Sequence, residues 1–237
     1  MIKIENVSTA GFEPAVRGMR NPMNSWDKSD SKYLRQEDGH IIAGRYEIGP
    51  NDHELMMRLV KAGTDHRKYM RMIVVYADVT APLYWWKEFD TYKVGTVANS
   101  CSTMHKIHAE EFTLNDFSCE RLLIETRKGG VEITDLFGDG TGYYVTPLRL
   151  LALTVRCLNK YRDLYLQTGD KTWWEQMIQL LPSSYNQRRT VMLSYEVLAN
   201  IYHARKGHKL IEWRHFCRWI ESLPYYELIT REEKLND

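Results

Sequence analysis

Apolar and polar residues alternate near the start of the chain, and a β-rich stretch follows at residues 70–79. At the start, Ile2 and Ile4 fall on one face, which predicts a short strand over residues 1–8. Residues 70–79 are rich in β-branched side chains and predict a buried strand. Ala81 and Pro82 then open a short aromatic helix, because proline is favoured near the first helical position.

Apolar residues at helical spacing predict most of the remaining elements. A helix over 51–62 is capped by Asn51 or Asp52 and ended by Gly63. The other predicted helices cover residues 11–19, 147–166, 170–181, 187–205 and 211–222. Residues 21–49 are polar and predict a long functional loop or lid, residues 120–133 a helix or a strand pair, and residues 138–142 a glycine-rich turn.

Strands that come early and helices that come late indicate an α+β protein with a mixed sheet and a helical C-terminal half. The chain has no internal repeat, no low-complexity tract and no Pro/Gly linker. We therefore expect one domain over residues 1–237.

The charge balance excludes several classes of partner. The chain carries 32 Lys and Arg against 31 Asp and Glu, so no overall field attracts nucleic acid or an anionic membrane. It begins without a signal peptide and lacks a run of about 18 apolar residues. Four cysteines far apart, with no CxxC pair, favour reduced thiols in the cytosol. A cytoplasmic protein is expected.

Arg205 is anomalous in the pattern of the helix predicted at 187–205. Apolar residues form one stripe of that helix, and Arg205 continues it at the next helical step, whereas Glu196 falls on the opposite face. The stripe consists of Val191, Tyr195, Leu198, Ile201 and Tyr202. A guanidinium keeps its proton, so an inward arginine requires an anion, either an internal carboxylate or a bound ligand. The alternative is an arginine that reaches water at the helix end. Asn200 falls on a second inward-tending face and needs polar partners if buried.

Residues 180–205 resemble the C-terminal signature of flavin-dependent thymidylate synthases. In that family a Leu-Pro precedes, at fixed distance, a helix reading Asn-Ala-Arg-x-Leu-x-Asn/His-Phe-Leu-x-x-Arg, and the match is gapless from Pro182 to Arg205. The resemblance implies that Arg205 grips the pyrimidine of dUMP and that Asn200 contacts flavin. Ser194 replaces an asparagine that also contacts flavin.

The segment from residue 65 to 105 is similar to the same family but departs from its defining motif. His66 falls on a histidine beside the flavin, and residues 80–90 match the strand and helix before the motif. Where the family has Arg-His-Arg-x-x-Ser-x-Asn-x-x-Ser-x-Arg-Tyr, this chain reads Thr-Tyr-Lys at 91–93, with Lys93 and Thr96 as conservative replacements. Each lost arginine removes charge-assisted bonds of about 1.5–3 kcal/mol, so weak flavin binding is expected.

The resemblance implies a divergent enzyme that methylates dUMP or a related pyrimidine nucleotide at C5. Methylenetetrahydrofolate would donate the carbon, with FAD and NADPH supplying the reducing power, in a homotetramer whose active sites lie between subunits. The candidate residues divide by ligand. For substrate they are Arg205, Asn99, Ser102, Lys93 and Glu88, and for flavin His66, Asn200, Ser194 and Thr96. The alternatives are a regulatory nucleotide-binding protein that has lost flavin and catalysis, and a pyrimidine-hydroxymethylating enzyme.

No catalytic residue and no metal site is assigned from the sequence. Cys101 lies where a pyrimidine-contacting serine would be, and a thiolate could attack C6, but no general base is identifiable for it. His105 and His108 are spaced like metal ligands but lack a third partner.

Overall fold

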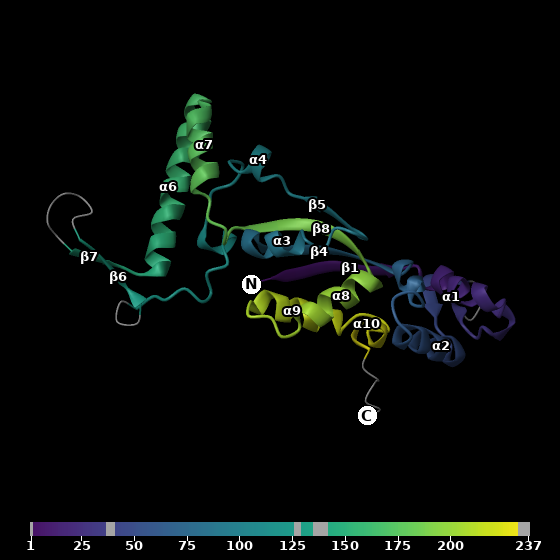
Figure 1. Cartoon of the computed structure of the whole chain (residues 1–237). Coiled ribbons are helices and arrows are strands. Elements are labelled where there is room, and N and C mark those ends of the chain that lie inside the picture. The colour runs from purple at the N-terminus through teal and green to yellow at the C-terminus, as the bar shows by residue number, and fades with distance from the viewer. Residues whose placement is uncertain (1, 37–40, 126–128, 135–141, 232–237) are drawn as a thin grey trace. The chain divides into compact units, whose positions relative to one another are not determined.

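The computed structural model describes residues 2–36, 41–125, 129–134 and 142–231 (Figure 1). The chain divides into two compact units. The sheet unit comprises Ile2–Val79, Glu88–Asn99 and Arg189–Asp237. The hairpin unit comprises Thr80–Lys87 and Ser100–Arg188. The expectation of a single domain stays a prediction.

A four-stranded sheet forms the centre of the sheet unit. Its strands follow the spatial order β1-β4-β8-β5, and β4 and β8 continue at one end into residues of the hairpin unit. The strands are β1 (Lys3–Ala10), β4 (Val74–Pro82), β8 (Asn186–Ser194) and β5 (Thr96–Ser100). Strand β4 buries Val75, Ala77 and Val79, which alternate along it. The strands predicted at residues 1–8 and 70–79 are thus confirmed, although 3-10 helix η3 (Lys68–Arg71) shortens the second.

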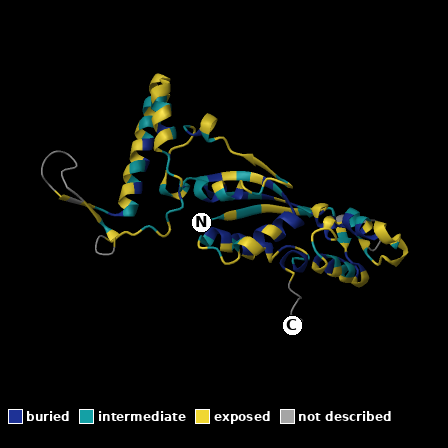
Figure 2. Cartoon of the chain, in the orientation of Figure 1, coloured by how far each residue is buried: buried dark blue, intermediate teal, exposed yellow. Residues whose placement is uncertain are grey.

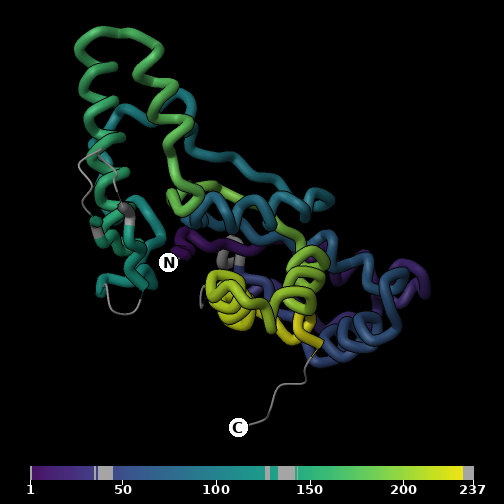
Figure 3. Tube along the Cα trace, turned by 60° about the vertical axis from the view of Figure 1, so that its left-hand side comes forward, coloured from purple at the N-terminus to yellow at the C-terminus, as the bar shows by residue number. Residues whose placement is uncertain are grey.

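Helices pack around α8 in the sheet unit. Helix α8 (Tyr195–Arg205) contacts α9, α10 and η3, and most of its residues are buried (Figures 2 and 3). The other helices of this unit are α1 (Phe12–Arg20), α2 (Pro50–Lys61), α9 (Ile211–Ile220) and α10 (Glu227–Thr230). Helix α3 (Leu83–Phe89) begins in the hairpin unit and ends in the sheet unit.

The first half of the helix predicted at 187–205 is wrong, because residues 186–194 form strand β8. Gln187, Val191 and Leu193 are buried, whereas Arg188 and Thr190 between them are exposed. This period of two places the strand inside the sheet. Ser194 then ends the strand and caps α8, since its hydroxyl accepts the backbone N–H of Val197 at 3.3 Å.

The loop predicted at residues 21–49 is also corrected. It contains 3-10 helices η1 (Asn21–Met23) and η2 (Trp26–Lys28), and strands β2 (Lys32–Arg35) and β3 (Ile41–Glu47) pair antiparallel. Asp52 is not the cap of α2, which begins at Pro50 after Gly49.

The carboxylate of Asp52 instead ties the preceding loop to α2. The side chain is fully buried, and its Oδ1 accepts from Arg20 Nε at 2.6 Å. Its Oδ2 accepts from the hydroxyls of Ser29 and Ser31, each at 2.6 Å, and from the backbone N–H of Asp30 and Ser31. A buried charge with this many donors fixes the course of residues 29–31.

Two long helices and a strand pair make up most of the hairpin unit. Helices α6 (Pro147–Thr168) and α7 (Lys171–Leu180) lie side by side (Figures 1 and 3), and the side chain of Asp170 caps α7. The other elements are α4 (Thr103–Lys106), η4 (Leu114–Asp116), β6 (Val131–Thr134) and β7 (Gly142–Val145). Strand β6 pairs with β7, which lies outside residues 120–133, so neither the helix predicted over that range nor a strand pair within it is found among its described residues. Most of the turn predicted at 138–142 lies outside the described residues.

The core of the hairpin unit is apolar, and its residues all belong to this unit. It consists of Ile107, Phe112, Phe117, Leu151, Val155, Leu158 and Met177. None of the helices in the described ranges is both long enough and apolar enough to cross a membrane.

Candidate functional site

Glu88 and Arg205 form an ion pair in the sheet unit. Glu88 lies in the last turn of α3, and Arg205 is the last residue of α8. Arg205 Nη1 donates to Glu88 Oε2 at 2.7 Å, and Trp213 Nε1 of α9 donates to the same oxygen at 2.8 Å. His208 Nε2 lies 3.6 Å from that oxygen. Three elements therefore converge on one carboxylate oxygen.

Aromatic rings enclose the Arg205 guanidinium. Its Cζ lies 4.8 Å from the ring centroid of the fully buried Trp213 and 5.7 Å from that of Tyr92, and its Nε donates to the Tyr92 hydroxyl at 2.9 Å. The side chain is 19% exposed. The inward orientation predicted for Arg205 is confirmed, and the anion it meets is the internal carboxylate of Glu88. We call Glu88, Tyr92, Arg205, His208 and Trp213 the Arg205 cluster.

A pocket of about 380 Å³ borders this cluster through Tyr92. It is lined by Phe89, Asp90, Tyr92, Lys93, Thr96 and Ala98, and we call it the Lys93 pocket. Asp90 forms an ion pair with Arg189 at 2.7 Å, whereas no ion pair of Lys93 occurs within the described ranges. The Thr96 hydroxyl oxygen is buried and makes no hydrogen bond to any described residue. A buried hydroxyl without a partner is uncommon and favours a ligand or water at this position.

Ser194 has a structural role that the sequence did not predict. Its hydroxyl caps α8, and its backbone N–H donates to Gly95 O at 3.3 Å. Gly95 adopts a φ of 76°, and a Cβ there would lie 3.1 Å from Val197 Cγ2 and 3.4 Å from Ser194 Oγ. The residue that replaces the family asparagine thus holds the turn before β5 against the start of α8.

The remaining predicted residues are not gathered at this site. Asn200 is exposed, so its predicted place on an inward face is wrong: the buried side of α8 runs through Leu198, Ile201 and Tyr202. His66, Asn99 and Ser102 are also exposed. Ser102 belongs to the hairpin unit, where its hydroxyl caps α4 by accepting from His105 N at 3.0 Å. Their roles toward a ligand stay predictions.

Glu196 is another correction, because it is buried rather than on a solvent-facing side of α8. Arg71 Nε donates to its Oε2, and Arg67 Nε lies 3.6 Å from its Oε1. Arg67 is itself buried, so two guanidinium groups share one carboxylate. Burial lowers the pKa of His203 in the same region, and nearby cations, Arg231 foremost, lower it further.

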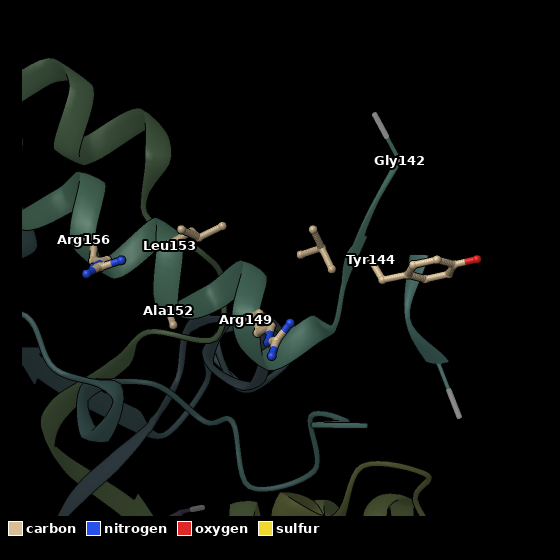
Figure 4. Close-up of a pocket in the computed structure, with 7 residues that line it drawn as sticks. Gly142, Tyr144, Arg149, Ala152, Leu153 and Arg156 are labelled. Atoms are coloured by element: carbon tan, nitrogen blue, oxygen red, sulfur yellow. The ribbon is translucent and has the colours of Figure 1, made fainter. Parts of the chain in front are cut away.

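A larger pocket, of about 640 Å³, lies in the hairpin unit and contains none of the predicted residues. Its lining residues are Gly142, Tyr144, Val145, Arg149, Ala152, Leu153 and Arg156. Figure 4 shows both arginines on α6 and Tyr144 on β7. Tyr144, Arg149 and Leu153 are exposed, so this is an open surface hollow, and none of its described lining residues carries a carboxylate. Size alone does not make it the candidate site.

Sequence reasoning missed Tyr92, His208 and Trp213. Tyr92 lies four residues after Glu88, a spacing that would place both side chains on one face of a helix, but α3 ends at Phe89. Trp213 begins an apolar stripe of α9 that continues at Phe216 and Ile220, and its indole N–H needs an acceptor when buried. A buried indole N–H that needs an acceptor was the signal in the sequence that could have pointed to Trp213. Within the described residues no group of three or more His, Cys, Asp or Glu side chains could hold a metal ion.

Comparisons with known proteins place this geometry on a known fold. No protein-family model and no curated protein sequence matches the chain. A crystal structure of thymidylate synthase X (ThyX) from Helicobacter pylori with FAD and dUMP matches with a TM-score of 0.64 and 16% identity, covering 98% of both chains. A second structure of the flavin-dependent enzyme ThyX from Helicobacter pylori, complexed with FAD and dUMP, has a TM-score of 0.62 and 16% identity, covering 98% of this chain and 100% of that one.

A structure of a different enzyme also matches the chain. The UMP/dUMP methylase PolB from Streptomyces cacaoi, bound with 5-Br UMP, has a TM-score of 0.59 and 14% identity, covering 98% of this chain and 95% of that one. At these identities the likeness establishes the fold. The α+β fold of the thymidylate-synthase-complementing type, predicted from the sequence, is confirmed.

Proposed function

We propose that this chain binds a pyrimidine nucleotide and modifies its base at C5, as a divergent counterpart of the flavin-dependent thymidylate synthases. The observation that carries the proposal is the Arg205 cluster with the adjoining Lys93 pocket. The fold supports it, because neighbours of the same fold have been solved with FAD and dUMP or with 5-Br UMP.

The cluster and the pocket offer complementary groups to a nucleotide. The guanidinium of Arg205 presents a planar fork that can donate to acceptor atoms of a base. Lys93 offers a point charge to a phosphate, and Thr96 offers a buried hydroxyl to the phosphate or the ribose. In this proposal Glu88 orients the fork through its ion pair with Arg205 Nη1.

The residues assigned to flavin do not fit a flavin site within one chain. His66 and Asn200 are exposed, and the hydroxyl of Ser194 already caps α8. Tyr92 lies at the middle position of the altered arginine triplet. Its side chain is uncharged, and its hydroxyl accepts a hydrogen bond from Arg205 Nε. We therefore assign no step of the reaction to flavin. Folate and NADPH enter the proposal by resemblance only.

Two measurements on the purified chain test the proposal. Calorimetric titration with dUMP, dCMP, UMP and CMP should show saturable binding of at least one of them. The visible absorbance of bound flavin, before and after incubation with FAD, then decides between an active flavoenzyme and a flavin-free protein. Absence of binding to every pyrimidine monophosphate at millimolar concentration would contradict the proposal.

A second candidate function is a nucleotide-binding protein that has lost flavin and catalysis. The exposure of His66 and Asn200 favours it, because within the described residues of one chain neither side chain lines a pocket beside the Arg205 cluster. Nucleotide binding without flavin uptake, and without C5 modification when methylenetetrahydrofolate and NADPH are supplied, would support this second function.

A further inference from the structure

Helix α9 borders another pocket of the sheet unit, of about 360 Å³, and this pocket is rich in positive charge. Three of its lining residues are cations, Lys206, Arg214 and Arg218, and one is a carboxylate, Glu221. The lining therefore carries an excess of two positive charges, whereas the whole chain carries a net charge of only +1. A concave site lined by one sign of charge concentrates ions of the opposite sign, which are anions here.

The two arginines of this pocket have no carboxylate partner. Both lie on α9, and neither Arg214 nor Arg218 forms an ion pair or a side-chain hydrogen bond with a residue in the described part of the chain. The carboxylate of Glu221 accepts instead from the Tyr202 hydroxyl, at 2.9 Å through Oε1. Two guanidinium forks are therefore available to a ligand.

The stability of α9 does not explain the position of Arg214. A cation near the C-terminus of a helix is favourable, which accounts for Arg218 in the last turn. Arg214 is the fourth residue of α9, near the end of the helix where the dipole disfavours a positive charge. It also precedes Arg218 by four residues, a spacing at which like charges repel. An anion held between the two arginines would replace this repulsion with attraction.

The rest of the lining is uncharged. Ile211 is half-buried, and Cys217 is 3% exposed. Burial raises the pKa of the Cys217 thiol to about 12, so the thiol stays neutral at physiological pH. The pocket thus places apolar surface beside its cations.

We propose that this pocket binds a small phosphorylated ligand, with its phosphate between Arg214 and Arg218 and its organic part against Ile211. A phosphate monoester carries about −1.5 to −2 charge at pH 7, which matches the two excess positive charges. Guanidinium groups bind phosphate oxygens through paired hydrogen bonds. The volume lies near the lower end of the range of about 300–1,000 Å³ for small-molecule sites. No lining residue is shared with the Lys93 pocket, so this is a separate site.

Two probes of the same shape test the match of charge. Phenyl phosphate is a dianion at about pH 8, well above its second pKa of about 6, whereas phenyl sulfate carries one negative charge. Calorimetric titration of the full-length chain at about 0.15 M salt screens exposed charges that are far apart. We expect saturable binding of phenyl phosphate, at least about tenfold tighter than that of phenyl sulfate. Equal affinity, or no saturation at millimolar concentration, overturns the proposal.

Variants of the two arginines locate the binding. Arg214→Gln and Arg218→Gln should each raise the Kd for phenyl phosphate at least about tenfold, the loss expected for a hydrogen bond to a charged group. Both side chains are exposed, so the variants should keep the circular dichroism of the unaltered chain. Arg58→Gln is the matched control, because it removes the same charge from an exposed arginine on α2 of the same unit.

The control should leave the Kd unchanged. If Arg214→Gln and Arg218→Gln bind phenyl phosphate as well as the unaltered chain does, the phosphate binds elsewhere and the proposal is overturned. An equal loss in Arg58→Gln would show a general effect of charge and would also overturn it. None of these outcomes bears on the proposed function, which depends on Arg205 and the Lys93 pocket.

Discussion

Arg205 contributes to the packing of the fold, and we propose that it also binds the ligand. Its aliphatic stem continues the buried stripe of α8, while its guanidinium is held by Glu88, Tyr92 and Trp213. An arginine in this setting contributes through packing as well as charge. The sequence predicted an inward arginine that needs an anion, and it left open whether the anion was internal. The internal carboxylate could not be identified from the sequence, because Glu88 lies 117 residues away.

Arg205→Ala should weaken nucleotide binding by at least about 1.5 kcal/mol, the lower range for hydrogen bonds to charged groups. It should also lower the free energy of unfolding by about 1–2 kcal/mol, because a partly exposed ion pair and a cation–π contact are both lost. Arg205→Lys should rescue incompletely, since a point charge cannot serve Tyr92, Glu88 and a ligand together. Calorimetric titration and thermal unfolding measure the two effects.

Arg162→Ala is the control for the Arg205 variants. The side chain of Arg162 is 18% exposed, nearly the same as that of Arg205, and its Nε donates to the backbone of His108 in the hairpin unit. This variant should change stability without changing nucleotide affinity. If Arg205→Ala and Arg162→Ala bind nucleotide equally well, Arg205 has no part in the site.

At the scale of elements, long regular patterns were predictable and short or centrally buried ones were not. Helices α6, α7 and α9 begin and end within a few residues of their predicted bounds, because proline and an apolar stripe mark each of them and a capping residue begins α6 and α7. Strand β8 was assigned to a helix because Val191 and Tyr195 also fit a helical step. Gln187, Val191 and Leu193 also fall at every second position, the period of a strand. Only the position of β8 inside the sheet decides between the helical and the strand period.

The buried network around Asp52 shows why the segment at 21–49 is not a free lid. Burial alone would raise the pKa of the Asp52 carboxyl, but hydrogen bonds from Ser29, Ser31 and Arg20 outweigh it and lower the pKa below its usual value. The sequence carried no signal of this, because the partners are spread over three short segments. The network joins η2 and the start of β2 to α1 and α2.

Asp52→Asn should lower the free energy of unfolding by about 3–5 kcal/mol, because it leaves the buried guanidinium of Arg20 without its charge partner. The pH dependence follows from the lowered pKa. The stabilisation is fully present above the pKa of about 3.9 of an unfolded aspartate and is lost as pH falls through the lower folded value. Denaturant unfolding between neutral pH and pH ~3 measures both effects.

Asp163→Asn is the matched control for the Asp52 variant. Asp163 forms an exposed pair with Arg162, and such pairs contribute about 0–1 kcal/mol. A loss in Asp52→Asn no greater than in this control would contradict an anchoring role for the network.

At the scale of the whole molecule, the fold was predictable from a family resemblance concentrated in two segments, and the site only in part. Glu88 and Arg205 form an ion pair, and Lys93 shares a pocket with Thr96, which the resemblance assigns to flavin. Of the other flavin candidates, Ser194 caps α8, and His66 and Asn200 are exposed, and no pattern within a single chain could show whether a second copy covers them.

We expect the chain to assemble as a homotetramer, because the residues that the resemblance assigns to flavin are exposed in the single chain. Asn200 lies on the exposed side of α8, a helix that is otherwise largely buried, and His66 precedes η3, which packs against α8. In the family that the chain resembles, active sites form between subunits, which would cover both positions.

Light scattering should give four times the chain mass of 28.0 kDa. Asn200→Arg should reduce that mass, because an added charge and a longer side chain oppose burial at a subunit contact, whereas Asn51→Arg, at an exposed position in the first turn of α2, should not. A mass of 28.0 kDa at micromolar concentration for the unaltered chain would contradict both the tetramer and a site shared between subunits.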